Sequence, residues 1–154
     1  MSAVRPLPAG RFRTMEEADL KQVMGIDRSA YEFPWTEGIF RDCLRVGYWC
    51  RVLEQRPTIE AYGVMSVAAD EAHLLNLCVR PDKQGQGLGR RMLTHMVDLA
   101  GRTGADTMLL EVRFSNQVAI ALYTSLGFAE LGTRRSYYPA RQGREDALVL
   151  ARAL

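Results

Sequence analysis

Apolar residues recur at intervals of three and four along several stretches of the chain, which is the pattern of helices with one buried face. The clearest of these stretches holds Leu88, Met92, Leu93, Met96, Val97 and Ala100. It predicts an amphipathic helix that ends near Gly101 or Gly104. An earlier helix is predicted to begin at a capping box formed by Thr14 and Glu17 and to end near Ala30.

Two shorter helices are predicted from their capping residues. Thr36 begins the first of them, and Asn116 begins the second, which ends near Ser125. Before Thr36, Pro34 cannot continue a helix, so residues 31–35 are predicted to form an aromatic loop between two helices.

The other apolar stretches predict seven strands, at residues 11–13, 48–54, 59–69, 72–79, 107–112, 128–137 and 147–151. Short turns at residues 55–57 and 70–71 join three of them into an antiparallel meander. The order of elements predicts an α/β fold of the α+β type, with a mixed sheet and helices on both faces. Since no repeat or linker divides the chain, we expect one domain over residues 1–154, with residues 1–9 as a flexible N-terminal segment.

Composition is that of a globular protein. Of 154 residues, 47% are apolar and 25% are charged, a balance that excludes a disordered chain. The apolar runs are too short to span a bilayer. Arg5, Pro6 and Pro8 lie where a secretory signal would need an apolar core, so a cytoplasmic location without membrane contact is the expectation.

Charge, histidine and cysteine content narrow the function classes further. A net charge of +2 gives no reason to expect direct contact with nucleic acid. Only two histidines are present, His73 and His95, in no metal-binding spacing, so we expect no metal. Cys43, Cys50 and Cys78 form no CxxC pair and are interpreted as reduced thiols in the core.

The most specific segment is LLNLCVRPDKQGQGLGRR at residues 74–91, in which a buried strand leads through three alternating glycines into a helix. Gly85, Gly87 and Gly89 allow a tight turn with outward amides, and the start of the helix adds a positive dipole, so the segment favours a diphosphate ligand. An ordinary strand-to-helix connection with no ligand is equally compatible with the glycine spacing. A dinucleotide fingerprint would need glycine where Arg90 stands, and a Walker A ending is absent.

Four segments together resemble one family, the GCN-five-related N-acetyltransferases (GNAT). RPDKQGQGLGRRML resembles its R/Q-x-x-G-x-G/A signature, and LLEVRFSNQVAIALYTSLGF resembles its second hallmark. FPWTEGIF and RRSYYPARQGREDALVL are similar to the substrate loop and the ending of its RimI branch, the ribosomal-protein-alanine N-acetyltransferases. The four matches lie in the family's order and span residues 33–150.

The resemblance implies a mostly antiparallel seven-stranded sheet that splays between its fourth and fifth strands and takes acetyl-coenzyme A in the gap. The residues that it implies as cofactor contacts are Leu77, Cys78, Val79, Gln84, Gly85, Gln86, Gly87, Leu88, Gly89, Arg90 and Asn116. The backbone of the first three would pair with the pantetheine arm, and an N–H near Val79 would face the thioester oxygen. Residues 85–90 would hold the pyrophosphate.

The resemblance also implies two catalytic residues, Glu111 as general base and Tyr123 as general acid. Without it, the residues favour structural roles: Glu111 as a strand-end carboxylate paired with an arginine such as Arg113, and Tyr123 as a core residue on the stripe that it shares with Ala119 and Leu122. The family match reverses both preferences.

The acceptor implied is the α-amine of a protein N-terminus, specifically the N-terminal alanine of a small-subunit ribosomal protein. An α-amine with a pKa near ~8 is about a tenth neutral at pH 7, whereas a lysine amine near ~10.4 is neutral in under ~0.1% of molecules, so one carboxylate is a sufficient base for the former. Lysine or small-molecule acetylation is the alternative. A non-catalytic module that only binds coenzyme A is a third hypothesis, against which the presence of both candidate catalytic residues argues.

Five aromatic and proline residues are candidates to wall a slot for an extended peptide N-terminus: Phe33, Pro34, Trp35, Tyr137 and Tyr138. A core cluster that anchors the loop explains them equally well. We expect the protein to act as a monomer.

Overall fold

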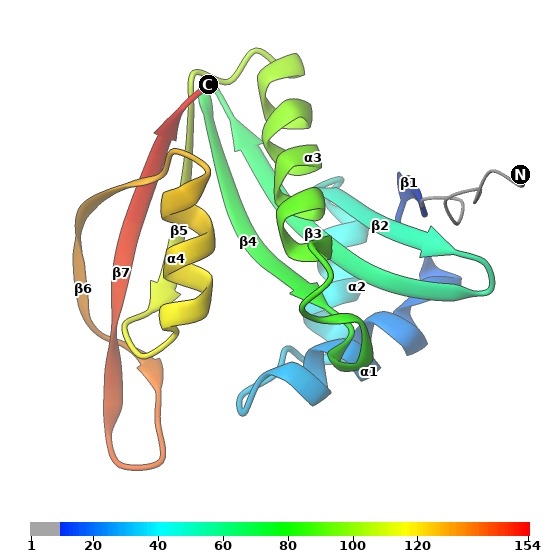
Figure 1. Ribbon diagram of the computed structural model, residues 1–154, viewed down its shortest axis with the longest axis horizontal. Coiled ribbons are helices and arrows are strands. Elements are labelled where there is room, and N and C mark those ends of the chain that lie inside the picture. The colour runs from blue at the N-terminus through cyan, green and yellow to red at the C-terminus, as the bar shows by residue number, and fades with distance from the viewer. Residues whose placement is uncertain (1–9) are drawn as a thin grey trace, which may run out of the picture.

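The computed structural model describes residues 10–154, which form seven strands and four α-helices around one sheet (Figure 1). The strands are β1 Arg11–Thr14, β2 Trp49–Gln55, β3 Thr58–Ala68, β4 Glu71–Val79, β5 Thr107–Arg113, β6 Ala129–Pro139 and β7 Arg144–Ala153. The helices are α1 Leu20–Ala30, α2 Glu37–Arg45, α3 Leu88–Arg102 and α4 Gln117–Ser125, and short 3-10 turns occupy Glu17–Asp19 and Pro81–Lys83. The flexible segment predicted for residues 1–9 lies outside the described residues.

The sheet has the order β1-β2-β3-β4-β5-β7-β6. All neighbouring pairs are antiparallel except β4 and β5, which run parallel because α3 returns the chain between them. The predicted meander is therefore the run β2-β3-β4, and the predicted mixed, mostly antiparallel sheet is confirmed.

Two apolar cores cover the two faces of the sheet. The first packs α3 and α4 against residues such as Met65, Met108 and Leu150. The second packs α1 and α2 against the opposite face, where Tyr62 meets Phe40 edge-on with ring centroids 5.9 Å apart. The helices lie on opposite sides of the sheet, as predicted (Figure 1). All three cysteines are buried thiols, in agreement with the sequence.

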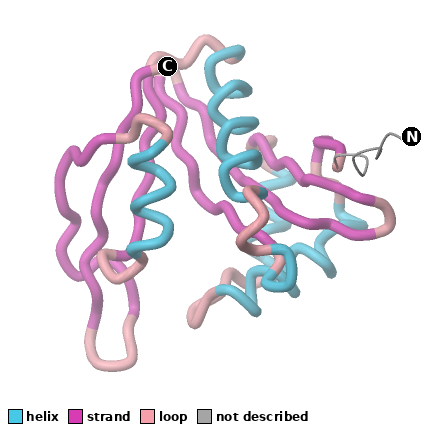
Figure 2. Tube along the Cα trace, in the orientation of Figure 1, coloured by secondary structure: helices cyan, strands magenta, loops and turns pink. Residues whose placement is uncertain are grey.

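The sheet opens between β4 and β5. The two strands pair only from Glu71 opposite Thr107 to Leu74 opposite Leu110. Beyond this point β4 continues to Val79 and β5 to Arg113 without pairing, and their traces diverge (Figure 2). The predicted splay between the fourth and fifth strands is confirmed.

The predicted capping box of Thr14 and Glu17 is wrong. Thr14 still belongs to β1, where it pairs with Arg51, so the chain turns two residues later. The cap is formed instead by Glu16, whose N–H donates to Asp19 Oδ2 at 2.7 Å. Arg13 draws Asp19 into place with two hydrogen bonds of 2.7 and 2.8 Å, a long-range contact that a local capping pattern does not reveal.

Candidate active site

The free edge of β4 presents backbone groups to the opening. Arg80 N donates to Glu60 O of β3 at 2.8 Å, so the backbone groups of Val79 and Leu77, one and three residues earlier, point away from β3. Their carbonyls take side-chain donors: Tyr31 Oη donates to Leu77 O at 2.8 Å and Gln84 Nε2 donates to Val79 O at 3.2 Å. Their N–H groups are left to face the opening, which fits an extended ligand with amides of its own.

The glycine-rich loop ends in a set of free amides. Gly85 and Gly87 have φ of +77° and +80°, which glycine adopts without strain. Within residues 10–154, the amides of residues 85–90 have no acceptor, and the first that is paired is Arg91 N, which donates to Gly87 O at 3.1 Å. Nothing lies within 4 Å of the space where side chains at Gly85 and Gly87 would begin. Such a row of outward N–H groups at a helix start fits the diphosphate of a nucleotide cofactor.

Gly89 differs from the other two glycines, and the tight-turn role predicted for it is wrong. It lies in the first turn of α3, and a Cβ there would be 3.4 Å from Leu122 of α4 and 3.7 Å from Val79. Its small size therefore allows α3 to approach α4 and β4 closely.

Three polar side chains around this loop form hydrogen bonds with other parts of the protein. Gln84 bonds β4 as described, Arg90 Nη2 donates to Ser125 Oγ at 2.8 Å, and Asn116 Oδ1 accepts from Ala119 N at 3.2 Å. The predicted cap at Asn116 is thus confirmed. The backbone of the loop remains the part that is free for a ligand.

Glu111 lies on β5 one residue beyond the last β4–β5 pair, with its side chain 8% exposed. His73 Nε2 donates to Glu111 Oε2 at 2.5 Å, and Arg134 Nε lies 3.2 Å from Oε1. The hydrogen bond from His73 is the main cause that holds the pKa of Glu111 below its usual value, against the opposing effect of burial. The carboxylate is therefore ionised at neutral pH.

Arg113 does not pair with Glu111. Its Nη1 atom donates to Pro139 O at 2.9 Å and to Glu145 at 3.1 Å. The structural interpretation of Glu111 predicted an arginine partner such as Arg113. An arginine does pair with it, but it is Arg134 of β6, and His73 of β4 is a second partner that the interpretation did not include.

Tyr123 approaches the opening from the other face of the sheet, on α4. Its ring packs edge-on against Phe128 with centroids 5.8 Å apart. Burial raises the pKa of Tyr123 to about 12, with a smaller contribution from Cys78 of β4. Among the described residues its hydroxyl has no hydrogen-bond partner, so a protonated phenol is available to donate.

The five candidate acceptor residues separate into two groups. The guanidinium of Arg113 lies over the rings of both Phe33 and Tyr138, 5.4 and 4.6 Å from their centroids. Tyr137 contacts Tyr138 at 4.9 Å, while Pro34 is exposed. Trp35 packs instead on Phe40 at 5.1 Å, next to the second core, as an anchor of the loop.

The Arg144-Glu145-Asp146 run at the start of β7 shapes the β6–β7 hairpin. Arg144 donates to Ser136 O at 2.7 Å and to Tyr137 O at 2.8 Å, and Asp146 accepts from Ser136 N at 2.8 Å. Ser136 has a φ of +51°, so these bonds hold a strained irregularity in β6. The run thereby sets the position of the two tyrosines that follow Ser136.

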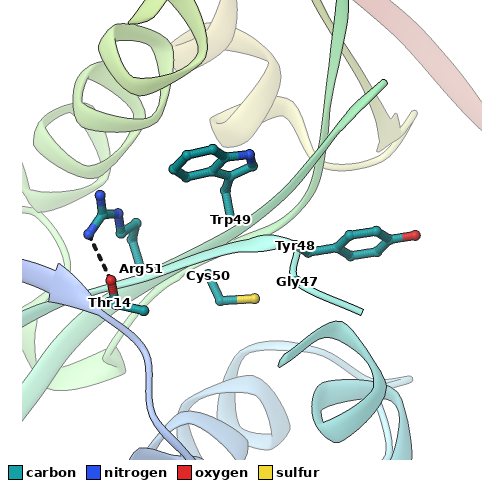
Figure 3. A pocket seen from close by; sticks show the side chains of 6 residues that line it. All are labelled: Thr14, Gly47, Tyr48, Trp49, Cys50 and Arg51. Carbon is teal, nitrogen blue, oxygen red and sulfur yellow. Dashed lines mark hydrogen bonds between the residues drawn. The ribbon is translucent and has the colours of Figure 1, made fainter. Parts of the chain in front are cut away.

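A separate hollow lies at the start of β2, between Thr14 and residues 47–51 (Figure 3). Arg51 Nη1 donates to Thr14 Oγ1 at 3.1 Å beside it, and Trp49 is 39% exposed. β3 and β4 separate this hollow from the opening, so it takes no part in the candidate site.

Sequence reasoning missed His73 and Arg134. No local sequence signal indicates His73, because its place opposite Leu109, two residues before Glu111 on the same face, depends on the parallel register of β4 and β5. In the part of the chain from residue 10 onward, no group of three or more histidine, cysteine or acidic side chains is arranged for a metal ion. No helix over the same residues has the length and apolarity needed to cross a membrane.

The splayed sheet, the free amides at the start of α3, and a carboxylate and a phenol at the opening together define an acyltransferase class. The model of the acetyltransferase (GNAT) family matches residues 18–128, and the chain belongs to that family. The resemblance seen in the four motifs is thus confirmed.

The chain is similar to two bacterial enzymes described as [ribosomal protein bS18]-alanine N-acetyltransferase. It is 44% identical to the one from Escherichia coli K12 over 138 residues, 90% of this chain and 93% of that protein. It is 42% identical to the one from Salmonella typhimurium over 137 residues, 89% and 93% of the two chains. The crystal structure of the ribosomal-protein-S18-alanine N-acetyltransferase from E. coli matches with a TM-score of 0.87 at 42% identity, covering 94% of this chain and 93% of that one.

Proposed function

We propose that this protein transfers the acetyl group of acetyl-coenzyme A to the α-amine of a protein N-terminus, with the N-terminal alanine of ribosomal protein bS18 as its natural acceptor. The observation that supports the proposal is that Glu111 lies on β5 one residue past the last β4–β5 pair, while Tyr123 packs with the core on the opposite face and near Cys78 of β4. The acceptor is taken from the two similar bacterial enzymes, and a ribosomal acceptor implies a cytoplasmic reaction.

The residues that would hold acetyl-coenzyme A are those whose backbone groups are free at the opening and at the start of α3. The β4 edge at Leu77, Cys78 and Val79 would run beside an extended arm, to which Leu77 and Val79 offer their amides, and residues 85–90, after Gln84, offer the amide row to a diphosphate. Asn116, at the start of α4, is a further proposed contact. Acetyl-coenzyme A supplies the acetyl group as a thioester.

The two candidate catalytic side chains divide the proton transfers. A C–N bond forms to the amine and the C–S bond breaks, so the nitrogen must lose a proton and the sulfur must gain one. Glu111, ionised at neutral pH, accepts the proton from nitrogen, directly or through a water molecule. Tyr123, still protonated because its pKa is about 12, donates to the sulfur.

The lowered pKa of Glu111 favours an α-amine over lysine. A weak carboxylate base suits an amine that is already about a tenth neutral at pH 7, whereas lysine is neutral in under about 0.1% of molecules. The residues proposed to wall the acceptor slot are Phe33, Pro34, Trp35, Tyr137 and Tyr138. Trp35 acts indirectly, because it packs on Phe40 and anchors the loop. The proton transfers are assigned to side chains alone, and the proposal includes action as a monomer without a metal.

The test is an acetylation assay with the purified protein, acetyl-coenzyme A and two peptides of the bS18 N-terminal sequence. One peptide has a free α-amine and the other a blocked one, and each carries a lysine. Mass spectrometry should place the acetyl group on the α-amine of the free peptide alone. Modification of the blocked peptide at lysine would favour lysine acetylation, and acetyl-coenzyme A binding without any product would favour a non-catalytic binding module.

A further inference from the structure

His73, which donates a hydrogen bond to Glu111, takes no part in the proposed proton transfers. His73 lies on β4 in the short paired segment, opposite Leu109 of β5. Glu111 is the first residue of β5 past the last pair, so the His73–Glu111 hydrogen bond spans the point where the two strands separate.

The two partners of Glu111 differ in their exposure. The His73 side chain is 33% exposed and that of Arg134 is 57% exposed, so His73 is the inner partner and Arg134 the outer one. Long exposed side chains hold their partners weakly, because solvent screens the charge and rotamer freedom opposes a fixed geometry. The orientation of the carboxylate therefore depends mainly on His73.

The hydrogen-bonding capacity of the carboxylate leaves room for a substrate. An ionised carboxylate has about four acceptor positions, two on each oxygen. His73 uses one position on Oε2 and Arg134 uses one on Oε1, so each oxygen keeps one position for a nitrogen or a water. A carboxylate held in this way is oriented without being blocked.

We propose that His73 is a positioning residue for acetyl transfer, which orients the Glu111 carboxylate toward the opening between β4 and β5. The inference rests on the proposed function, because it assigns His73 a role through the candidate base.

The role has a consequence for pH dependence. The titratable and charged groups around Glu111 are His73 of β4 and two residues of β6, Arg134 and Tyr138. Burial raises the pKa of Tyr138, and the negative charge of the nearby Glu111 raises it further. A base with a lowered pKa loses its activity only as pH falls through that lowered value. When the hydrogen bond from His73 is removed, burial raises the pKa of Glu111, so proton uptake and loss of activity begin at higher pH.

The experiment compares kcat of the wild-type protein with that of His73→Leu and His73→Gln between pH 5 and 8, at saturating acetyl-coenzyme A and peptide. For His73→Leu, kcat should fall about tenfold at pH 7, and its ratio to wild type should fall further as pH is lowered. His73→Gln keeps an N–H donor and should recover most of the activity. The KM for acetyl-coenzyme A should remain within about twofold of wild type for both, because the amides of residues 85–90 are untouched.

The matched control is His95→Gln at the only other histidine, which stacks on Phe12 on the α3 side of the sheet. It should leave kcat and its pH dependence unchanged, and thermal unfolding of all variants checks that they fold. A constant ratio of His73→Leu to wild-type kcat across the pH range, or a His73→Gln variant no better than His73→Leu, would overturn the inference while the proposed function stands. Wild-type protein inactive toward every amine would overturn the proposed function, and this inference with it.

Discussion

Glu111 illustrates how a carboxylate in an apolar strand stays charged. Burial alone raises the pKa of an acid, yet the pKa of Glu111 is lowered because a histidine and an arginine supply hydrogen bonds and positive charge. Tyr123 has no such partner among the described residues, and burial raises its pKa to about 12. Two side chains at one opening are thereby kept in opposite protonation states, which suits one to accept a proton and the other to donate one.

Tyr123→Phe should separate binding from turnover. The ring packing on Phe128 is kept, so the protein should fold and bind acetyl-coenzyme A with little change. Loss of the hydroxyl removes the proposed proton donor, and kcat should fall about a hundredfold. Steady-state kinetics and calorimetric titration measure the two effects. Wild-type turnover in the variant would exclude Tyr123 as the general acid.

At the scale of elements, one buried carboxylate connects α1, β3, β4 and the aromatic loop. Asp27, fully buried near the end of α1, accepts hydrogen bonds from Tyr62 Oη, from Asn76 Nδ2 at 3.0 Å and from Trp35 N at 2.8 Å. The last of these bonds fixes the loop that carries Phe33 and Pro34. The loop is therefore held to the sheet by hydrogen bonding as well as by the packing of Trp35.

Asp27→Ala should be one of the most destabilising single changes in the protein. It removes the acceptor of three donors, of which the Tyr62 hydroxyl is buried and the other two are half-buried, so the free energy of unfolding should fall by about 3 kcal/mol. Asp27→Asn, which keeps an acceptor oxygen and the side-chain size, should cost less. Urea unfolding measures both variants, and equal losses for the two would show that the hydrogen bonds of the carboxylate are not the cause.

Most elements could be predicted from the sequence because each depends on local periodicity and caps. The helix that begins at Leu88 and the cap at Asn116 are examples. The start of α1 could not, because Arg13 and Asp19 meet through tertiary contacts. The role of His73 could not be predicted for a related reason. Its hydrogen bond to Glu111 depends on the register of β4 and β5, which are joined through α3, and no local pattern encodes that register. The motifs thus predicted candidate residues for the site but not the residues that contact and support those candidates.

At the scale of the whole molecule, β1 is attached to the edge of the sheet by an ion-pair cluster. Arg13 donates to Asp19 and, at 2.7 and 3.1 Å, to Glu54 of β2. Its hydrogen bonds are the largest cause that lowers the pKa of both carboxyls. Acids with lowered folded-state pKa values stabilise the fold above their unfolded values, and that stabilisation is lost as pH falls through the folded values.

Arg13→Leu should therefore change the acid stability of the protein. The wild-type unfolding temperature should decrease progressively below about pH 5, as the two carboxyls take up protons. The variant should start from a lower unfolding temperature at pH 7 and lose less of it in acid, because its two carboxyls lack their main partner and Glu54 keeps only the pairs with Arg11 and Arg56. Thermal scans from pH 7 to 3 give the comparison, and two parallel curves would contradict it.

The opening of the sheet also bears on how long each copy of the protein survives in a cell. Residues 75–79 of β4 form a strand edge that does not pair with β5, and we propose that acetyl-coenzyme A covers it in place of another strand. A ligand that binds only the folded chain adds about 2.7 kcal/mol of stability at a hundredfold excess over its dissociation constant. When acetyl-coenzyme A is scarce, that contribution is withdrawn, and proteases should degrade the protein faster. The supply of the acetyl donor would then regulate the amount of enzyme as well as its rate.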